Sequence, residues 1–147
     1  MKNNILIING PNINKIGNRE KKIYGKVNIN EYLINLKKKF LKKKYNIKIY
    51  NSNSESKIID ILYKKSNIKN IIGIIINLGA YSHTSLAISD TIRSIKNKLK
   101  IIEVHISNIF IREDIRHKSL ISPYCKGIII GLGIKVYKMA ILSLILK

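Results

Sequence analysis

Residues 71–79 read IIGIIINLG, a short and continuous apolar run that breaks at the tripeptide NLG. A run of this kind, bounded by polar and turn-forming residues, predicts a buried β-strand that leads into a loop. The same pattern occurs at residues 5–8, where the apolar run ends at NGP, residues 9–11. Further apolar runs occupy residues 47–50, 101–106 and 128–130. We therefore expect five buried strands, with polar loops after the first, third and fourth.

The segments between these runs have the spacing of amphipathic helices. Asn30 is expected to cap a helix over residues 31–44, whose apolar residues recur at helical intervals opposite a lysine-rich face. Ser54 is expected to cap a second helix that starts at residue 55, and Thr84 or Ser85 a third that runs to about residue 95. An apolar stretch over residues 134–146 predicts a closing helix.

Apolar strands that alternate with helices indicate a parallel sheet covered on both faces. The expected fold is a single α/β domain over residues 1–147, a doubly wound five-stranded parallel sheet. In such a sheet, ligands bind at the carboxyl ends of the strands, so the polar loops should converge on one site.

The composition is strongly basic, with a formal net charge of +20. Such a charge would favour nucleic acid or an anionic membrane as a partner. However, Lys outnumbers Arg by 24 to 4, and Ile, Lys and Asn make up more than half of the chain. This bias indicates drift toward A- and T-rich codons, with Lys filling the solvated surface. The lysines are spread over several segments without an aromatic ladder, so we expect no specific nucleic-acid partner.

Against that background the four arginines are informative, because Arg offers a planar fork of donors that Lys lacks. Three of them, Arg19, Arg112 and Arg116, lie in the motifs described below, and Arg93 is expected on a helix surface.

Cysteine content and hydropathy bear on the cellular setting. Cys125 is the single cysteine and cannot form an internal disulfide, and no charged-then-apolar leader opens the chain. The apolar stretch 134–146 is interrupted by Lys135 and Lys138 and is too short to span a bilayer. We expect a cytoplasmic protein without a transmembrane segment.

The polar loops carry motifs in a fixed order along the chain. They are NGPNIN (9–14), GNRE (17–20), YG (24–25), SNSE (52–55), NLGAYSHTS (77–85), EVHISN (103–108), RE (112–113) and RH (116–117). In these motifs the chain resembles the type II dehydroquinases from end to end. The resemblance implies a 3-dehydroquinate dehydratase of the shikimate pathway, a hydro-lyase of aromatic amino acid biosynthesis. It also implies a flavodoxin-like strand order, 2-1-3-4-5, no metal or other cofactor, and trimers assembled into a homododecamer.

Elimination next to a ketone needs a base, an enolate stabiliser, an acid for the departing hydroxyl, and anchors for a polyhydroxy carboxylate. The resemblance assigns the base to Tyr24, whose phenolate needs a cation, and Arg19 is the obvious one. Both lie on a possible lid loop, residues 17–26. The resemblance makes His105 the general acid. Glu103 shares its strand face and can orient the imidazole.

By the same analogy Asn12 holds a water at the enolate oxygen. The residues that bind the substrate 3-dehydroquinate are expected to be Asn77, His83, Ile106, Ser107 and Arg116, with Arg112 as an electrostatic contributor. Asp90 is expected to act across a trimer interface.

The chain departs from the family pattern at Leu78, where proline is common, and at Ser56, Ser82 and Phe110. None of these changes removes a proposed reacting group. Leu78 is expected to make the loop that carries Asn77 less rigid.

Other interpretations have weaker support. Gly131-Leu132-Gly133 suggests a dinucleotide fingerprint, but residue 136 is Val and no further strand follows. A metal site would need His83, His105, His117 and Cys125 to gather without any tight ligand spacing. Ser82 beside His83 only superficially suggests a nucleophile and base. The alternative kept is a drifted family member that acts as a basic anion- or RNA-binding module.

Overall fold

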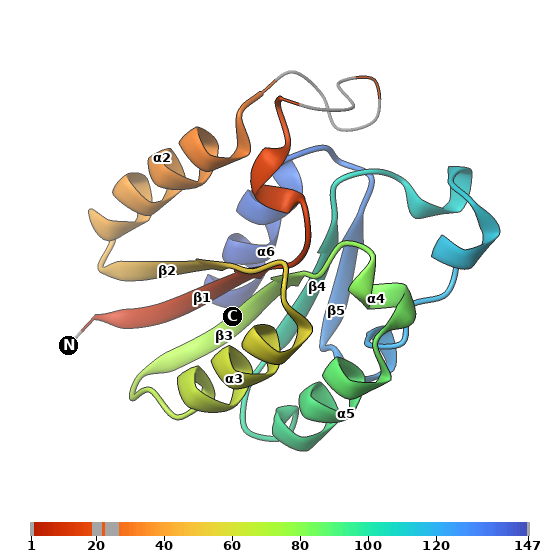
Figure 1. Cartoon of the computed structure of the whole chain (residues 1–147). Helices are drawn as coiled ribbons and strands as arrows, with labels where there is room; N and C mark the ends of the chain where they lie inside the picture. The colour runs from red at the N-terminus through yellow and green to blue at the C-terminus, as the bar shows by residue number, and fades with distance from the viewer. Residues whose placement is uncertain (1, 19–21, 23–26, 147) are drawn as a thin grey trace.

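The sheet has five parallel strands in the order β2-β1-β3-β4-β5 in the computed structural model, which describes residues 2–18, 22 and 27–146. The strands are β1 (Asn3–Asn9), β2 (Tyr45–Asn51), β3 (Ile71–Asn77), β4 (Ile101–His105) and β5 (Gly127–Ile130). Their order confirms the expected flavodoxin-like arrangement, and Figure 1 shows the sheet at the centre of the molecule.

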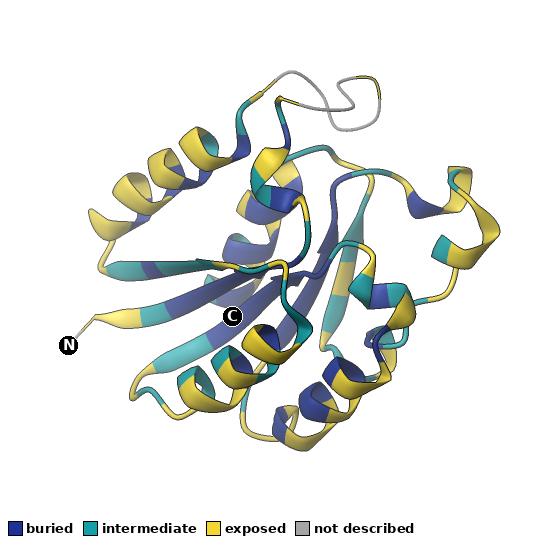
Figure 2. Ribbon diagram, in the orientation of Figure 1, coloured by how far each residue is buried: buried dark blue, intermediate teal, exposed yellow. Residues whose placement is uncertain are grey.

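Helices cover both faces of the sheet (Figure 1). On one face lie α2 (Ile29–Leu41) and α6 (Lys135–Ile145), and on the other lie α3 (Glu55–Ser66) and α5 (Leu86–Ile95). Alternate residues of each strand pack into two separate hydrophobic cores, one on each face of the sheet, because successive side chains of a strand point to opposite faces. Figure 2 shows the central strands buried between helices that are exposed on their outer sides. Within the described residues, no helix is long and apolar enough to cross a membrane.

Two helix starts match the expected caps. Ser54 accepts from the amide of Lys57 at the start of α3, and Ser85 accepts from that of Ile88 at the start of α5. The residues before α5 form a separate turn of helix, α4 (Tyr81–Thr84). Short 3-10 turns complete the loops: η1 (Ile13–Lys15), η2 (Ile109–Ile111), η3 (Asp114–Arg116) and η4 (Ser122–Tyr124).

The cap expected for the first helix was wrong. Asn28, not Asn30, caps α2, since its side chain accepts from the amides of Asn30 and Glu31. Ile29 is fully buried against the core, and this burial draws the helix start toward the sheet. The helix also ends earlier than expected, at Leu41, because Lys44 has a left-handed backbone (φ 67°) that leads into β2.

Three asparagines end the three neighbouring strands β2, β1 and β3. Asn9 pairs in register with Asn51 on one side and with Asn77 on the other. We call Asn51, Asn9 and Asn77 the asparagine row. Because the strands are parallel and in register, the three side chains leave the sheet toward the same face, the one covered by α2 and α6.

The loops after β1 and β3 are in direct contact. The amide of Gly10 donates to the carbonyl oxygen of Asn77 at 2.8 Å. A Cβ at position 10 would lie 2.3 Å from the carbonyl oxygen of Leu78, so only glycine fits. Leu78 itself is fully buried in the core under α3 and α5. The loop that carries Asn77 is therefore held by packing in place of the rigidity that proline would give.

Candidate active site

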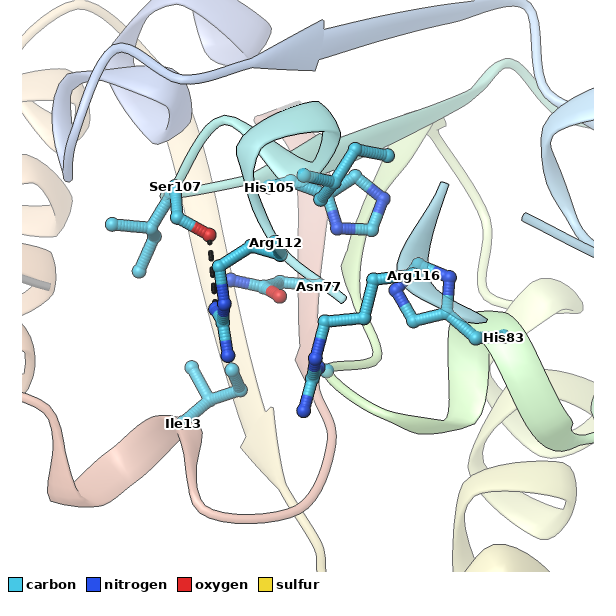
Figure 3. Close-up of a pocket in the computed structure, with 10 residues that line it drawn as sticks. Ile13, Asn77, His83, His105, Ser107, Arg112 and Arg116 are labelled. Atoms are coloured by element: carbon cyan, nitrogen blue, oxygen red, sulfur yellow. Dashed lines mark hydrogen bonds between the residues drawn. The ribbon is translucent and has the colours of Figure 1, made fainter. Parts of the chain in front are cut away.

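A pocket opens at the carboxyl ends of the strands, where the polar loops were expected to converge (Figure 3). It is lined by Ile13, Asn77, Gly79, His83, His105, Ile106, Ser107, Ile109, Arg112 and Arg116. The empty space in this open pocket, solvent at its mouth included, is about 340 Å³. Six of the residues expected to bind substrate line it, together with the expected general acid.

His105 and Glu103 form a buried pair at the end of β4. The Nε2 atom of His105 lies 2.6 Å from Oε1 of Glu103, and both side chains are almost completely inaccessible to solvent. The two residues are separated by one position on a strand, which puts them on the same face. Glu103 therefore contacts the imidazole as expected from the sequence.

Two serines complete the surroundings of Glu103. Ser119 donates to Oε1 at 2.7 Å, and Ser122 donates to Oε2. Burial alone would raise the pKa of Glu103, but the hydrogen bonds from His105, Ser122 and Ser119 outweigh burial and lower it. Glu103 is thus held as a carboxylate, and the nitrogen facing it must donate a proton. The opposite ring nitrogen of His105 is left for the pocket.

His83 stacks on His105, with ring centroids 5.6 Å apart. Its Nδ1 atom lies 2.8 Å from the carbonyl oxygen of Lys118. A carbonyl can only accept, so Nδ1 carries a proton. Burial lowers the pKa of His83, and the nearby His105 and Arg116 add to this effect, which the Lys118 bond and Glu103 oppose. His83 is therefore neutral near pH 7, with Nε2 as a hydrogen-bond acceptor.

Arg112 and Arg116 supply positive charge at the pocket (Figure 3). Glu113 contacts both guanidinium groups, at 2.9 Å from Nε of Arg116 and 3.5 Å from Nε of Arg112. Arg112 also donates to Oγ of Ser107 at 3.3 Å. Two guanidinium groups beside one small pocket favour an anionic ligand, since Arg matches a carboxylate with paired donors.

Asn77 is 3% exposed, and its Nδ2 atom donates to the hydroxyl of Tyr137 at 2.8 Å. Its oxygen faces the space between Arg112 and Arg116 (Figure 3). The site thus presents acceptors, Asn77 and His83, next to cations. Hydroxyl groups and a carboxylate on one molecule would satisfy such a set.

Other expected site residues lie outside this pocket. Asn12 lines an adjacent hollow that shares Ile13, Gly79 and Arg116 with it. Asp90 lies on the exposed side of α5 and pairs with Arg93 at 3.1 Å. Tyr24 and Arg19, with most of the expected lid over residues 17–26, fall outside the described residues.

The structure also bears on the interpretations given less weight. The amides of Gly131 and Gly133 donate to the carbonyl oxygens of His105 and Ile106, at 3.0 Å each, and are occupied within the protein. Ser82 is fully buried, and its hydroxyl has no hydrogen-bond partner among the described residues, whereas Nδ1 of His83 bonds the carbonyl oxygen of Lys118. Over the described ranges, no group of three His, Cys, Asp or Glu residues has the arrangement of a metal site.

Four further residues contact site residues, although no role was predicted for them from the sequence: Ser119, Ser122, Glu113 and Tyr137. The two serines and Glu113 lie within conspicuous polar segments, which was the available signal. Tyr137 lies in an apolar helix and looks like an ordinary core residue.

The fold and the pocket define an α/β enzyme with an acid–base site for a small anion. Comparison with known proteins gives the particular family: the dehydroquinase class II profile matches residues 3–145, and the chain belongs to this family.

A 3-dehydroquinate dehydratase of Caldicellulosiruptor saccharolyticus is 49% identical over 140 residues, which cover 95% of this chain and 94% of that protein. The crystal structure of type II dehydroquinase from Butyrivibrio crossotus superposes with a TM-score of 0.90 at 46% identity, over 97% of both chains. That of Propionibacterium acnes gives a TM-score of 0.89 at 33% identity, over 98% of this chain and 97% of the other. These relatives give no support to the alternative of a basic anion- or RNA-binding module.

Proposed function

We propose that this class II dehydroquinase removes water from 3-dehydroquinate by trans elimination, in the shikimate pathway that leads to aromatic amino acids. The observation that carries this function is the buried Glu103–His105 pair at a pocket edged by Arg112 and Arg116. The pair supplies a proton donor, and the guanidinium groups supply an anchor for a carboxylate.

The proposed reaction begins at the carbon next to the ketone. Tyr24, ionised beside Arg19, takes the carbon-bound proton, and the electron pair of that C–H bond forms an enolate. A water held by Asn12 stabilises the enolate oxygen. The enolate then expels the hydroxyl group, which leaves as water with a proton from His105. The product is 3-dehydroshikimate, a conjugated enone.

The rest of the pocket positions the substrate. Arg116 binds the carboxylate, with Arg112 contributing charge, while Asn77 and His83 accept hydrogen bonds from ring hydroxyls. Ile106 and Ser107 contribute through their backbone and hydroxyl groups. Oriented binding of this kind accelerates the elimination, because it holds the reacting atoms next to the catalytic groups and so lowers the entropic part of the activation barrier.

Growth of the enone absorbance when purified protein meets 3-dehydroquinate tests the function directly. We expect turnover that is unchanged by a metal chelator and needs no added nucleotide. A folded protein without turnover, but with saturable RNA retention on filters, would instead support a binding module.

We further propose that the protein works in the cytoplasm as a homododecamer of trimers, in which Asp90 reaches the site of a neighbouring subunit. Asp90 is exposed on α5 and does not line the pocket, which supports a role across an interface. Light scattering at micromolar concentration should give the dodecamer mass. A fully active monomer would refute both the assembly and the role of Asp90.

A further inference from the structure

Tyr137 lies deep beneath the pocket, at the point where α6 crosses the ends of β1 and β3. Its side chain is completely buried, and Asn9 and Asn77 are 1% and 3% exposed. The hydroxyl of Tyr137 donates to Oδ1 of Asn9 at 2.7 Å and accepts from Nδ2 of Asn77 at 2.8 Å. Tyr137 therefore bridges two members of the asparagine row, and only Asn77 reaches the pocket.

The hydrogen bonds of this bridge all donate in one direction, from Asn77 to Tyr137 and from Tyr137 to Asn9. Asn9 donates through Nδ2 to Oδ1 of Asn51 at 3.0 Å, which leaves its own oxygen to face the phenol. A phenol has a single proton, and here that proton goes to Asn9. Toward Asn77 the phenol can then only accept. The Asn77 amide must turn its nitrogen inward, and its oxygen is left to face the pocket (Figure 3).

Bulk water does not compete for the hydrogen bonds of this bridge, since the side chains of Tyr137, Asn9 and Asn77 are almost inaccessible to solvent. An amide with no fixed partner could present either end to a ligand, with opposite hydrogen-bonding character. Burial also raises the pKa of Tyr137, so the phenol keeps the proton on which the direction depends.

We propose that Tyr137 is a positioning residue for substrate binding, which fixes the Asn77 amide with its oxygen toward the pocket so that it accepts a hydrogen bond from a substrate hydroxyl. This inference rests on the proposed dehydratase activity and goes beyond it by assigning a role to a residue that does not line the pocket.

The central variant is Tyr137→Phe, which keeps the packed ring and removes the hydroxyl. The Asn77 amide loses its fixed orientation, so KM should rise about three- to tenfold, the size expected for one net hydrogen bond. We expect kcat to change less than twofold. Tyr32→Phe is the matched control, because Tyr32 packs against the same core from α2 but takes no part in the asparagine row. Its KM should match wild type.

A double-mutant cycle separates positioning from a general loss of structure. Asn77→Ala should raise KM, and adding Tyr137→Phe to it should raise KM no further, because the group being positioned is already gone. All variants should be compared at a temperature where circular dichroism shows each to be folded. A wild-type KM in Tyr137→Phe, or an equal further rise in the Asn77→Ala background, would overturn the inference.

If Tyr137→Phe does not fold, Asn9→Leu tests the bridge from its other end. Leucine removes the acceptor for the phenol proton, which can then turn to the oxygen of Asn77 and reverse the amide. We expect the same three- to tenfold rise in KM, and an unchanged KM would again refute the inference. Absence of turnover in the wild-type protein would refute the proposed function instead, so the two failures are distinguishable.

Discussion

The Nε2 atom of His105 lies 2.6 Å from Oε1 of Glu103, with both side chains sealed from solvent by the surrounding chain. This contact fixes which ring nitrogen faces the pocket, because a carboxylate can only accept a hydrogen bond. The proton donor of the proposed reaction is therefore positioned by a residue that does not line the pocket.

Glu103→Gln should lower kcat by about 10²-fold, at the lower end of what a positioned acid contributes. Glutamine keeps the size of the side chain but replaces the carboxylate that accepts from Nε2 of His105 with an amide, so the imidazole is no longer held in one orientation. Steady-state kinetics should show the loss in kcat with little change in KM. Glu31→Gln, a glutamate on the exposed side of α2, is the control and should behave as wild type.

Tyr24→Phe and Arg19→Ala should each lower kcat by about 10²- to 10⁴-fold. Phenylalanine removes the oxygen that takes the proton, and alanine at position 19 withdraws the charge that keeps the oxygen ionised. KM should change much less, because the anchors at the strand ends are untouched. A Tyr24→Phe enzyme with near-normal kcat would show that another group is the base.

Arg116→Ala should act mainly on binding, since a carboxylate anchor stabilises ground and transition states alike. Loss of a charge-assisted hydrogen bond should raise KM about 10- to 100-fold. Lys138→Ala removes the same charge from the exposed side of α6 and should leave KM unchanged. Equal effects of the two variants would mean that net charge, not the anchor, controls binding.

His83 should make substrate binding sensitive to acid. Burial lowers its pKa below the ordinary 6.5, so the neutral ring accepts a hydrogen bond near pH 7 and loses this ability once protonated. KM should therefore rise as the pH falls below about 6.5. The free energy of unfolding should also fall on acidification. A group whose pKa is depressed in the folded state contributes stability above its ordinary pKa and loses that contribution as the pH falls through the depressed pKa.

His83→Asn, which cannot titrate, separates this effect from other titrations. Its KM should be higher than that of wild type at pH 7 but nearly constant as the pH is lowered. A KM that still rises steeply with acid in this variant would place the titrating group elsewhere.

The strands were the part of the fold most accessible from the sequence, because a buried parallel strand is a continuous apolar run such as residues 71–76. The start of α2 was not accessible, since Asn28 and Asn30 are equally good caps and only the burial of Ile29 decides between them. The residues near the start of α2 do not reveal that tertiary contact, so the choice between the two caps could not be predicted from them.

The candidate site shows the same division. Glu103 and His105 were recognisable as a pair because strand alternation places them on one face. Tyr137 was not, because its partner Asn9 is 128 positions away and a tyrosine in an apolar helix has the pattern of an ordinary core residue. The motifs predicted the groups that face the ligand, whereas the groups that hold them depend on the folded topology.

The separation of Asn9 and Tyr137 also matters during synthesis. At ribosomal rates of about 5–20 residues per second, on the order of ten seconds pass between the two residues. In that interval a nascent chain can pair β1 with β2 and β3, yet the amide of Asn77 has no phenol to hold it. A stalled or truncated chain that lacks α6 would therefore contain every loop that faces the ligand and still bind it poorly.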